Sequence, residues 1–148
     1  MFPKDITKII LEYHVAPPLK LRASIDIEKL NWNWLSENPS AINLLEANPN
    51  KINWEWLSEN PSAINLLEAN PDKINWGNLS ANPSAMNLLE SNPDKIYWNY
   101  LSMNPSAMHL LESNPDKINW YYLLENINIF EIDRLKYKQM IDDILLNV

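Results

Sequence analysis

The strongest constraint on this chain is a 22-residue segment that recurs along it. Each copy begins with Trp, at Trp32, Trp54, Trp76, Trp98 and Trp120. In its first four copies the unit reads W-x-x-L-S-x-N-P-S-A-(I/M)-x-L-L-E-(A/S)-N-P-(D/N)-K-I-(N/Y), and residues 32–53 differ from residues 54–75 at only two positions. Self-similarity at a short fixed period is typical of repeat architectures, in which each unit packs on its neighbours.

Two Asn-Pro pairs divide each unit. Pro is tolerated at the first position of a helix, and the residue before it adopts the extended backbone of an N-cap, where Asn is favoured. Each pair therefore predicts the end of one helix and the start of the next. The eight pairs begin at Asn38, Asn48, Asn60, Asn70, Asn82, Asn92, Asn104 and Asn114.

The predicted helices are short, as residues 39–47 and 49–59 illustrate. Each is only about 15 Å long, and helices of that length do not persist alone in water. In the first of them Ala41, Ile42, Leu44 and Leu45 form one apolar arc that can pack on a neighbour. The sequence predicts an all-α fold, an α-solenoid of short two-helix 22-residue repeats with N- and C-terminal capping helices.

Two columns of the repeat are predicted to form the core because they do not vary or vary little between copies. The predicted core residues are Trp32, Trp54, Trp76, Trp98 and Trp120, with Leu35, Leu57, Leu79, Leu101 and Leu123.

The ends of the chain depart from the repeat, as the ends of a solenoid must to cover exposed core. We expect one domain spanning residues 1–148. It consists of an N-terminal cap at 1–25, the tandem repeats at 26–126 and a C-terminal cap helix at 127–148. The predicted closing helix carries Ile132, Leu135, Met140, Ile141, Ile144 and Leu145 on one face.

Differences between copies concentrate just after the Trp. The two variable columns are Asn33, Glu55, Gly77, Asn99 and Tyr121, and Trp34, Trp56, Asn78, Tyr100 and Tyr122. The residue before each first Asn-Pro pair also varies, as Glu37, Glu59, Ala81, Met103 and Glu125. Gly77 costs about 1 kcal/mol in a helix and packs nothing, so we expect that position to be exposed.

An invariant scaffold with variable aromatic positions is how repeat proteins build binding surfaces. We therefore predict that these two columns, apart from Gly77, form a face that binds a partner. The alternative is that Trp34, Trp56, Tyr100 and Tyr122 fill the periphery of the core, since each follows an apolar residue by four positions.

No pattern of catalytic residues is evident. The chain has no Cys and two His, and it carries one Gly, so a phosphate-binding glycine loop is absent. His14 is interpreted as a C-terminal helix cap and His109 as part of an exposed column. The Glu46, Glu68, Glu90 and Glu112 ladder is interpreted as a solvated face, paired with Lys51, Lys73, Lys95 and Lys117. We expect no enzymatic activity, no metal and no cofactor.

The formal net charge of −7 disfavours nucleic acid and anionic membranes as partners. No run of 18 apolar residues and no signal-peptide core occurs, so we expect an intracellular protein without membrane association.

The repeat text and the ending "NIFEIDRLKYKQMI" resemble a tandem-repeat family abundant in giant DNA viruses of amoebae and algae. The resemblance covers about residues 26–135. It implies a viral protein located in the host cytoplasm or the virion, and it implies no particular activity. The near-identity of two copies also fits a designed consensus sequence.

Three functions are compatible with these features. The first is a non-enzymatic scaffold that binds a protein partner through the variable aromatic and polar face. The second is a structural virion or assembly component, including a self-associating rod. The third is binding of carbohydrate or another ligand by the Trp and Tyr columns.

Overall fold

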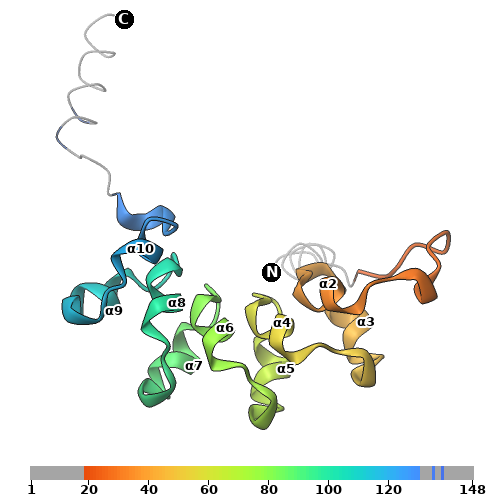
Figure 1. Cartoon of the computed structure of the whole chain (residues 1–148). Helices are drawn as coiled ribbons and strands as arrows, with labels where there is room; N and C mark the ends of the chain where they lie inside the picture. The colour runs from red at the N-terminus through yellow and green to blue at the C-terminus, as the bar shows by residue number, and fades with distance from the viewer. Residues whose placement is uncertain (1–18, 131–134, 136–137, 139–148) are drawn as a thin grey trace, which may run out of the picture. The chain divides into compact units, whose positions relative to one another are not determined.

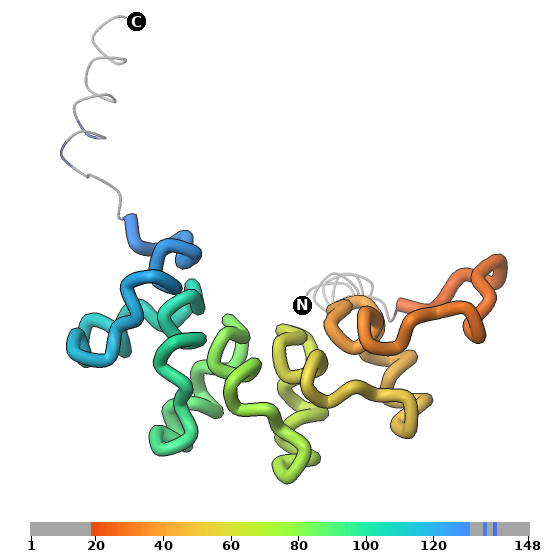
Figure 2. Tube along the Cα trace, viewed as in Figure 1, coloured from red at the N-terminus to blue at the C-terminus, as the bar shows by residue number. Residues whose placement is uncertain are grey.

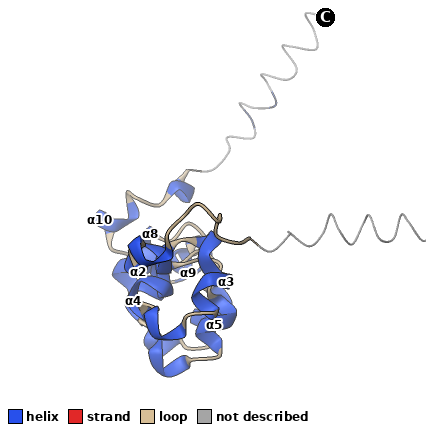
Figure 3. Ribbon diagram, turned by 90° about the vertical axis from the view of Figure 1, so that its right-hand side faces the viewer, coloured by secondary structure: helices blue, strands red, loops and turns tan. Residues whose placement is uncertain are grey.

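The computed structural model describes residues 19–130, together with Leu135 and Lys138. Regular structure in this part of the chain is entirely helical, with short helices joined by loops (Figure 3). The α-helices are α2 (Trp32–Glu37), α3 (Ile42–Glu46), α4 (Trp54–Glu59), α5 (Ile64–Glu68), α6 (Trp76–Ala81), α7 (Met86–Glu90), α8 (Trp98–Met103), α9 (Met108–Ser113) and α10 (Trp120–Leu123). The 3₁₀ helices are η1 (Ile27–Lys29), η2 (Pro39–Ala41), η3 (Pro49–Lys51), η4 (Pro71–Lys73), η5 (Pro93–Lys95), η6 (Pro115–Lys117) and η7 (Ile127–Ile129). None of these helices has the length and apolar content that a membrane span requires.

The chain divides into two compact units, with the boundary between Leu79 and Ser80. This boundary falls inside helix α6, so no linker separates the units. We call them the N-terminal unit and the C-terminal unit and describe each by itself.

Both units are built from the same path of the chain (Figure 2). A helix begins at Trp, a tight Asn-Pro-Ser turn follows, a second short helix runs to Glu or Ser, and a 3₁₀ turn leads to the next repeat. In the N-terminal unit α2 packs beside α4, and α3 and α5 form a second row (Figure 1). The prediction of an all-α solenoid of short two-helix repeats is confirmed.

The predicted capping helices lie mostly outside the described residues. Residues 1–18 and most of 131–148 are not described. Residues 19–25, also assigned to the N-terminal cap, form a loop with a turn.

The prediction that the second Asn-Pro pair of each unit starts one helix that continues through the Trp, as at residues 49–59, is wrong. Asn48 has φ −134° and ψ 59° and makes no capping hydrogen bond. Its side-chain amide instead donates to the Leu44 carbonyl at 2.8 Å, and so it closes the preceding helix. The chain makes one 3₁₀ turn and then passes through the extended Ile52 (φ −70°, ψ 127°), which separates that turn from α4.

Asn53 is the cap that starts α4. Its Oδ1 accepts the backbone N–H groups of Glu55 at 3.1 Å and Trp56 at 3.3 Å. Asn31 and Asn119 cap α2 and α10 in the same way. Tyr97 occupies the equivalent position before α8 and makes no side-chain cap. The Trp helices therefore begin at Trp, about five residues later than the Asn-Pro pairs predict.

The core consists of leucine and alanine columns. The fully buried apolar residues are Leu45, Leu57, Ala63, Leu67, Leu79, Ala85, Leu89, Leu101, Ala107 and Leu111. The predicted core positions Leu57, Leu79 and Leu101 are thus confirmed, whereas Leu35 and Leu123, in the first and last repeats, are half-buried.

The prediction of a buried Trp column needs correction. Trp32, Trp54, Trp76 and Trp98 are half-buried, and Trp120 is 68% exposed. These rings lie at the surface, and Trp32, Trp54 and Trp98 each carry over one face the lysine near the end of the same repeat. The lysine Nζ lies 4.8 Å from the Trp32 ring centroid, 4.6 Å from that of Trp54 and 4.5 Å from that of Trp98. Lys51, Lys73 and Lys117 thus contribute cation–π contacts, and within the described residues no ion pair joins these three to the glutamate ladder.

Buried asparagines join consecutive repeats. Asn60 is fully buried, and its side-chain NH₂ donates to the carbonyls of Ser36 at 2.8 Å and Asn38 at 3.0 Å in the preceding repeat. Its Oδ1 accepts the Ser62 N–H at 3.0 Å, within its own turn. Asn104 and Asn126 make the same two inter-repeat contacts in the C-terminal unit. One side chain thus satisfies three backbone groups, two of them in a different repeat.

The invariant serine of the unit has a parallel role. The Ser58 hydroxyl donates to the Trp54 carbonyl at 2.8 Å and accepts, at 3.0 Å, the N–H of Asn75, the residue just before the next Trp helix, α6. Among the described residues, no buried polar side-chain atom lacks a partner. These hydrogen bonds of the buried asparagines and serines explain why both residues recur in the repeat unit.

Candidate interaction surface

The variable columns lie in the first turn of the Trp helices, just after the capping asparagine. This placement directs their side chains away from the leucine core. Six of the nine residues predicted to form the binding face are exposed, and Trp56, Asn78 and Tyr122 are half-buried. None of the nine is buried.

In the N-terminal unit the face is a pair of indole rings. Trp34 on α2 is 66% exposed, and Trp56 on α4 is half-buried. Their ring centroids lie 5.5 Å apart with the planes inclined at 51°. The two rings support each other at the surface, so the alternative that Trp34 fills the core is wrong.

The C-terminal unit carries a tyrosine cluster in the same columns. Tyr100 and Tyr122 lie 6.1 Å apart between ring centroids, inclined at 30°. Tyr121 packs edge-on against Tyr122 at 5.5 Å and is 75% exposed. Tyr100 is 39% exposed, and Trp56 and Tyr122 are half-buried, so these three rings fit both a surface role and the periphery of the core.

The third repeat interrupts the aromatic column. Asn78 replaces the aromatic residue, and its side-chain amide donates to the Glu55 carbonyl at 3.0 Å. The expectation that Gly77 is exposed is wrong, because it is buried. Gly77 has no side chain that could reach solvent, so the surrounding residues cover its backbone.

Hydrogen bonds between asparagine side chains hold the polar residues of the face in place. The Asn53 amide donates to Asn33 Oδ1 at 3.0 Å in the N-terminal unit, and the Asn119 amide donates to Asn99 Oδ1 at 2.9 Å in the C-terminal unit. Each contact joins the capping asparagine of one Trp helix to the Trp helix before it. The polar edge of the face is therefore held in place before any partner arrives.

Three carboxylates lie on the same helices as the indole pair, and two of them, Glu37 and Glu59, are not among the nine residues predicted to form the face. Burial raises the pKa of Glu59, and the negative charges of Glu37 and Glu55 raise it further. Glu37 and Glu59 follow Trp34 and Trp56 by three positions, so each stands one turn along the same helix face. Their variation between copies was the signal that could have placed them in the site.

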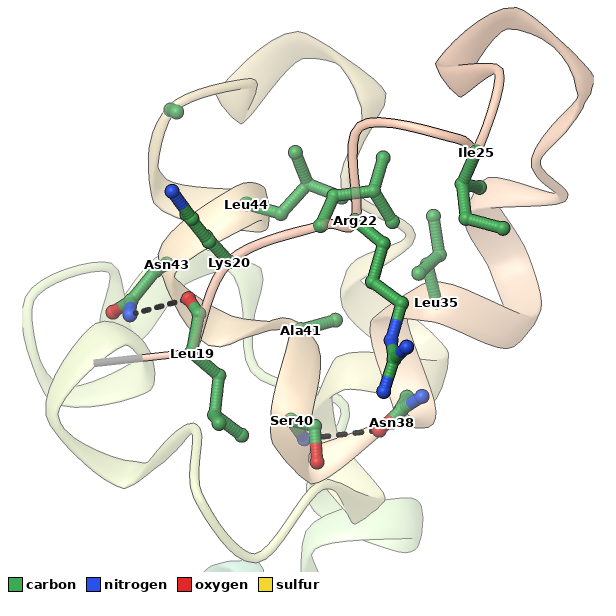
Figure 4. A pocket seen from close by; sticks show the side chains of 12 residues that line it. Leu19, Lys20, Arg22, Ile25, Leu35, Asn38, Ser40, Ala41, Asn43 and Leu44 are labelled. Atoms are coloured by element: carbon green, nitrogen blue, oxygen red, sulfur yellow. Dashed lines mark hydrogen bonds between the residues drawn. The ribbon is translucent and has the colours of Figure 1, made fainter. Parts of the chain in front are cut away.

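A second candidate site is a pocket of about 500 Å³ in the N-terminal unit (Figure 4). It lies between the loop at 19–25 and the first repeat, with Leu35, Ala41 and Leu44 forming part of its wall. In the second repeat the position equivalent to Leu35 is the fully buried Leu57. The pocket is therefore the first repeat's stacking face, covered only in part by that loop, and Asn43 holds the loop by donating to the Leu19 carbonyl at 3.1 Å.

One exposed pair has residue types that occur in acid–base catalysis. His109 Nε2 lies 2.7 Å from Glu90 Oε1, and both side chains are largely exposed. The two residues occupy solvent-facing columns of adjacent repeats, which is the geometry of a surface ion pair. Within the described residues, no group of three His, Asp or Glu is arranged to hold a metal ion.

Comparison with protein-family models, with curated proteins and with solved structures gives no match to this chain. The surface geometry described above therefore carries the functional argument.

Proposed function

We propose that this chain is a non-enzymatic repeat scaffold that binds a protein partner through the variable aromatic and polar face. The observation that carries the proposal is the exposure of large aromatic rings that pair with each other at the surface. Trp34 and Tyr121 are the extreme cases, at 66% and 75% exposed. Trp and Tyr are the residues most often found as energetic anchors of protein interfaces.

The positions that hold the repeats together are separate from the positions that vary, and this separation supports the same proposal. The leucines, the buried asparagines and the serines hold each repeat on the next, and they recur with little change. The two columns after each Trp lie outside this framework and change from copy to copy. Their side chains can vary without disturbing the hydrogen bonds that join the repeats.

A displayed random-peptide library tests the proposal without knowledge of the partner. Peptides are selected on the wild-type chain and then measured against a variant with Trp34→Ala, Trp56→Ala, Tyr100→Ala and Tyr122→Ala. The matched control carries Asn65→Ala, Glu68→Ala, Asn87→Ala and Glu112→Ala, which lie on the exposed side of the second helix row.

The proposal expects selected peptides to lose binding to the aromatic variant and to keep it with the control variant. Circular dichroism establishes that both variants remain folded. Peptides that bind the folded aromatic variant as tightly as the wild type would contradict the proposal.

A second candidate function is self-association. It is favoured by a row of exposed apolar side chains at the end of the repeats in the C-terminal unit, namely Leu124, Ile127 and Phe130. Exposed apolar patches of this kind mark interaction sites or aggregation-prone surfaces. Sedimentation velocity over a concentration series separates a monomer from a growing rod. A sedimentation coefficient independent of concentration would remove this candidate.

Viral origin and an intracellular or virion location are further proposals that rest on the resemblance alone. An antibody to this chain, applied to fractions of infected cells and to purified particles, tests both.

A further inference from the structure

We propose that the indole pair of the N-terminal unit is a docking site for an arginine-bearing basic segment of the protein partner. This proposal rests on the proposed function, since it names the chemistry of the partner that the same face takes. The site consists of Trp34 and Trp56 with Glu37 and Glu59, and we call it the Trp-Glu patch.

The first argument is the chemistry that the chain already uses on its other tryptophans. Trp32, Trp54 and Trp98 each carry a lysine nitrogen 4.5–4.8 Å from the ring centroid. The described residues place no such cation over Trp34 or Trp56. A cation from a partner would make the contact that the neighbouring column makes internally. Cation–π contacts of this kind contribute about 0.5–1 kcal/mol at exposed sites and more when desolvated.

The second argument is charge complementarity. Glu37 and Glu59 stand one helical turn beyond the two rings, and Glu55 is close enough to act on Glu59 electrostatically. Among the described residues, none of these three carboxylates forms an ion pair with a lysine or arginine. Mutual repulsion between them is relieved when a partner supplies positive charge. The net charge of −7 also attracts a basic segment over a longer range.

Arginine fits this geometry better than lysine. Its planar guanidinium stacks on an aromatic face and donates two parallel hydrogen bonds to one carboxylate. Each half of the Trp-Glu patch offers both groups, a ring and a carboxylate three residues further along the helix. Two such halves, on the adjacent helices α2 and α4, can take two arginines of one segment.

The other repeats provide an internal contrast. The third repeat has Asn78 and Ala81 at these positions, and the fourth has Tyr100 and Met103. Neither combines an indole with a carboxylate, and the fifth repeat combines a carboxylate, Glu125, with a tyrosine, Tyr122, instead of an indole. The patch is therefore a local property of the first two repeats rather than a general feature of the unit.

The test uses the full chain and a 12-residue synthetic peptide of alternating Arg and Ser. Two control peptides replace every Arg by Lys or by citrulline, which keeps the shape of arginine but lacks its charge. Dissociation constants are measured by isothermal titration calorimetry at low and at physiological salt.

Four double variants separate the contributions. The first is Trp34→Ala with Trp56→Ala, and Trp34→Phe with Trp56→Phe accompanies it as an aromatic replacement. The second is Glu37→Gln with Glu59→Gln. The control is Glu46→Gln with Glu68→Gln, which removes the same charge from exposed positions of the second helix row.

We expect the Arg peptide to bind the wild type, and the citrulline peptide to bind at least about tenfold more weakly. The Trp→Ala and Glu37/Glu59 variants should each weaken binding about tenfold, the Phe variant less than the Ala variant, and the Glu46/Glu68 control by less than about twofold. Equal weakening by the two Glu→Gln variants would show that net charge alone attracts the peptide, and it would overturn the proposal. Equal binding of the Arg and citrulline peptides, or no binding at all, would also overturn it.

Failure here is distinguishable from failure of the proposed function. If library peptides require Trp34 and Trp56 but are neutral or acidic, the face binds a partner and only its basic character is wrong. If library peptides do not require the aromatic residues, both proposals fail.

Discussion

Replacing the buried Asn60 by Ala should destabilise the chain more than any surface change of similar size. The wild-type side chain makes three hydrogen bonds, two to carbonyls of the preceding repeat and one from Ser62. At about 1 kcal/mol net for each bond the direct loss is about 3 kcal/mol. Backbone groups left unpaired in a buried site add about 1–2 kcal/mol. We expect a loss of about 4–5 kcal/mol in the free energy of unfolding.

Urea unfolding followed by tryptophan fluorescence and by far-ultraviolet circular dichroism measures this loss. Asn65→Ala is the matched control, because Asn65 is exposed on α5. We expect the control to change the unfolding free energy by less than about 0.5 kcal/mol. A loss below about 1 kcal/mol at Asn60, or a loss equal to that of the control, would refute the inter-repeat role of the asparagine ladder.

A second substitution at the same position checks the direction of the hydrogen bonds. Asn60→Asp keeps the acceptor for Ser62 but turns a carboxylate toward two carbonyl oxygens. Burial and these oxygens favour the protonated carboxyl, so its folded-state pKa lies above its unfolded value. The deficit of Asn60→Asp should therefore shrink as the pH falls, whereas that of Asn60→Ala should not depend on pH. Parallel pH curves for the two variants would mean that Asn60 does not donate to carbonyls.

Three further predictions concern single side chains, each measured by urea unfolding. Tyr97→Asn should raise the unfolding free energy by about 1 kcal/mol, because it restores the cap that α8 lacks; no gain would contradict the capping argument. Lys73→Gln should lower the unfolding free energy by about 0.5–1 kcal/mol, because the cation over Trp54 is lost. Tryptophan fluorescence that does not change on this substitution would count against that contact. The raised pKa of Glu59 means that the folded chain binds more protons than the unfolded chain just above pH 4.5, so stability falls as the pH rises through this range. Glu59→Gln should flatten that slope and Glu68→Gln should not.

The sequence predicts the fold class because its strongest signals are local. Pro and Asn punctuate the chain at a fixed period, and helices of this length require neighbours, so a stacked helical array follows directly. The positions of helix starts are less predictable. Asn48 and Asn53 are both good capping residues, and only the packed structure shows that Asn53 caps α4 while Asn48 closes the helix before it.

The inter-repeat contacts could not be predicted from a single unit. Asn60 bonds to residues 22 and 24 positions earlier, and its local role as a turn former already explains its presence. The Trp column shows the opposite difficulty. A ring that never varies fits both a buried core and a surface stack under lysine, and repetition alone does not distinguish the two.

The candidate face was predictable in position but not in composition. Variation between copies marked Trp34 and Trp56, and the structure adds Glu37 and Glu59 because they lie one turn further along the same helices. The predicted helix 49–59 already places Trp56 and Glu59 one turn apart. The burial of Glu59, and the nearby charges of Glu37 and Glu55, come from the packing of repeats and could not be predicted from one unit.

The central claim, that a partner binds the aromatic face, is tested most directly by fluorine NMR of the chain labelled with 5-fluorotryptophan. The seven Trp residues give separate signals that single Trp→Phe variants assign. On addition of a peptide selected on the wild-type chain, the signals of Trp34 and Trp56 should shift, while those of Trp54 and Trp98 under their lysines should stay in place. A bound peptide that leaves Trp34 and Trp56 unmoved would contradict the account.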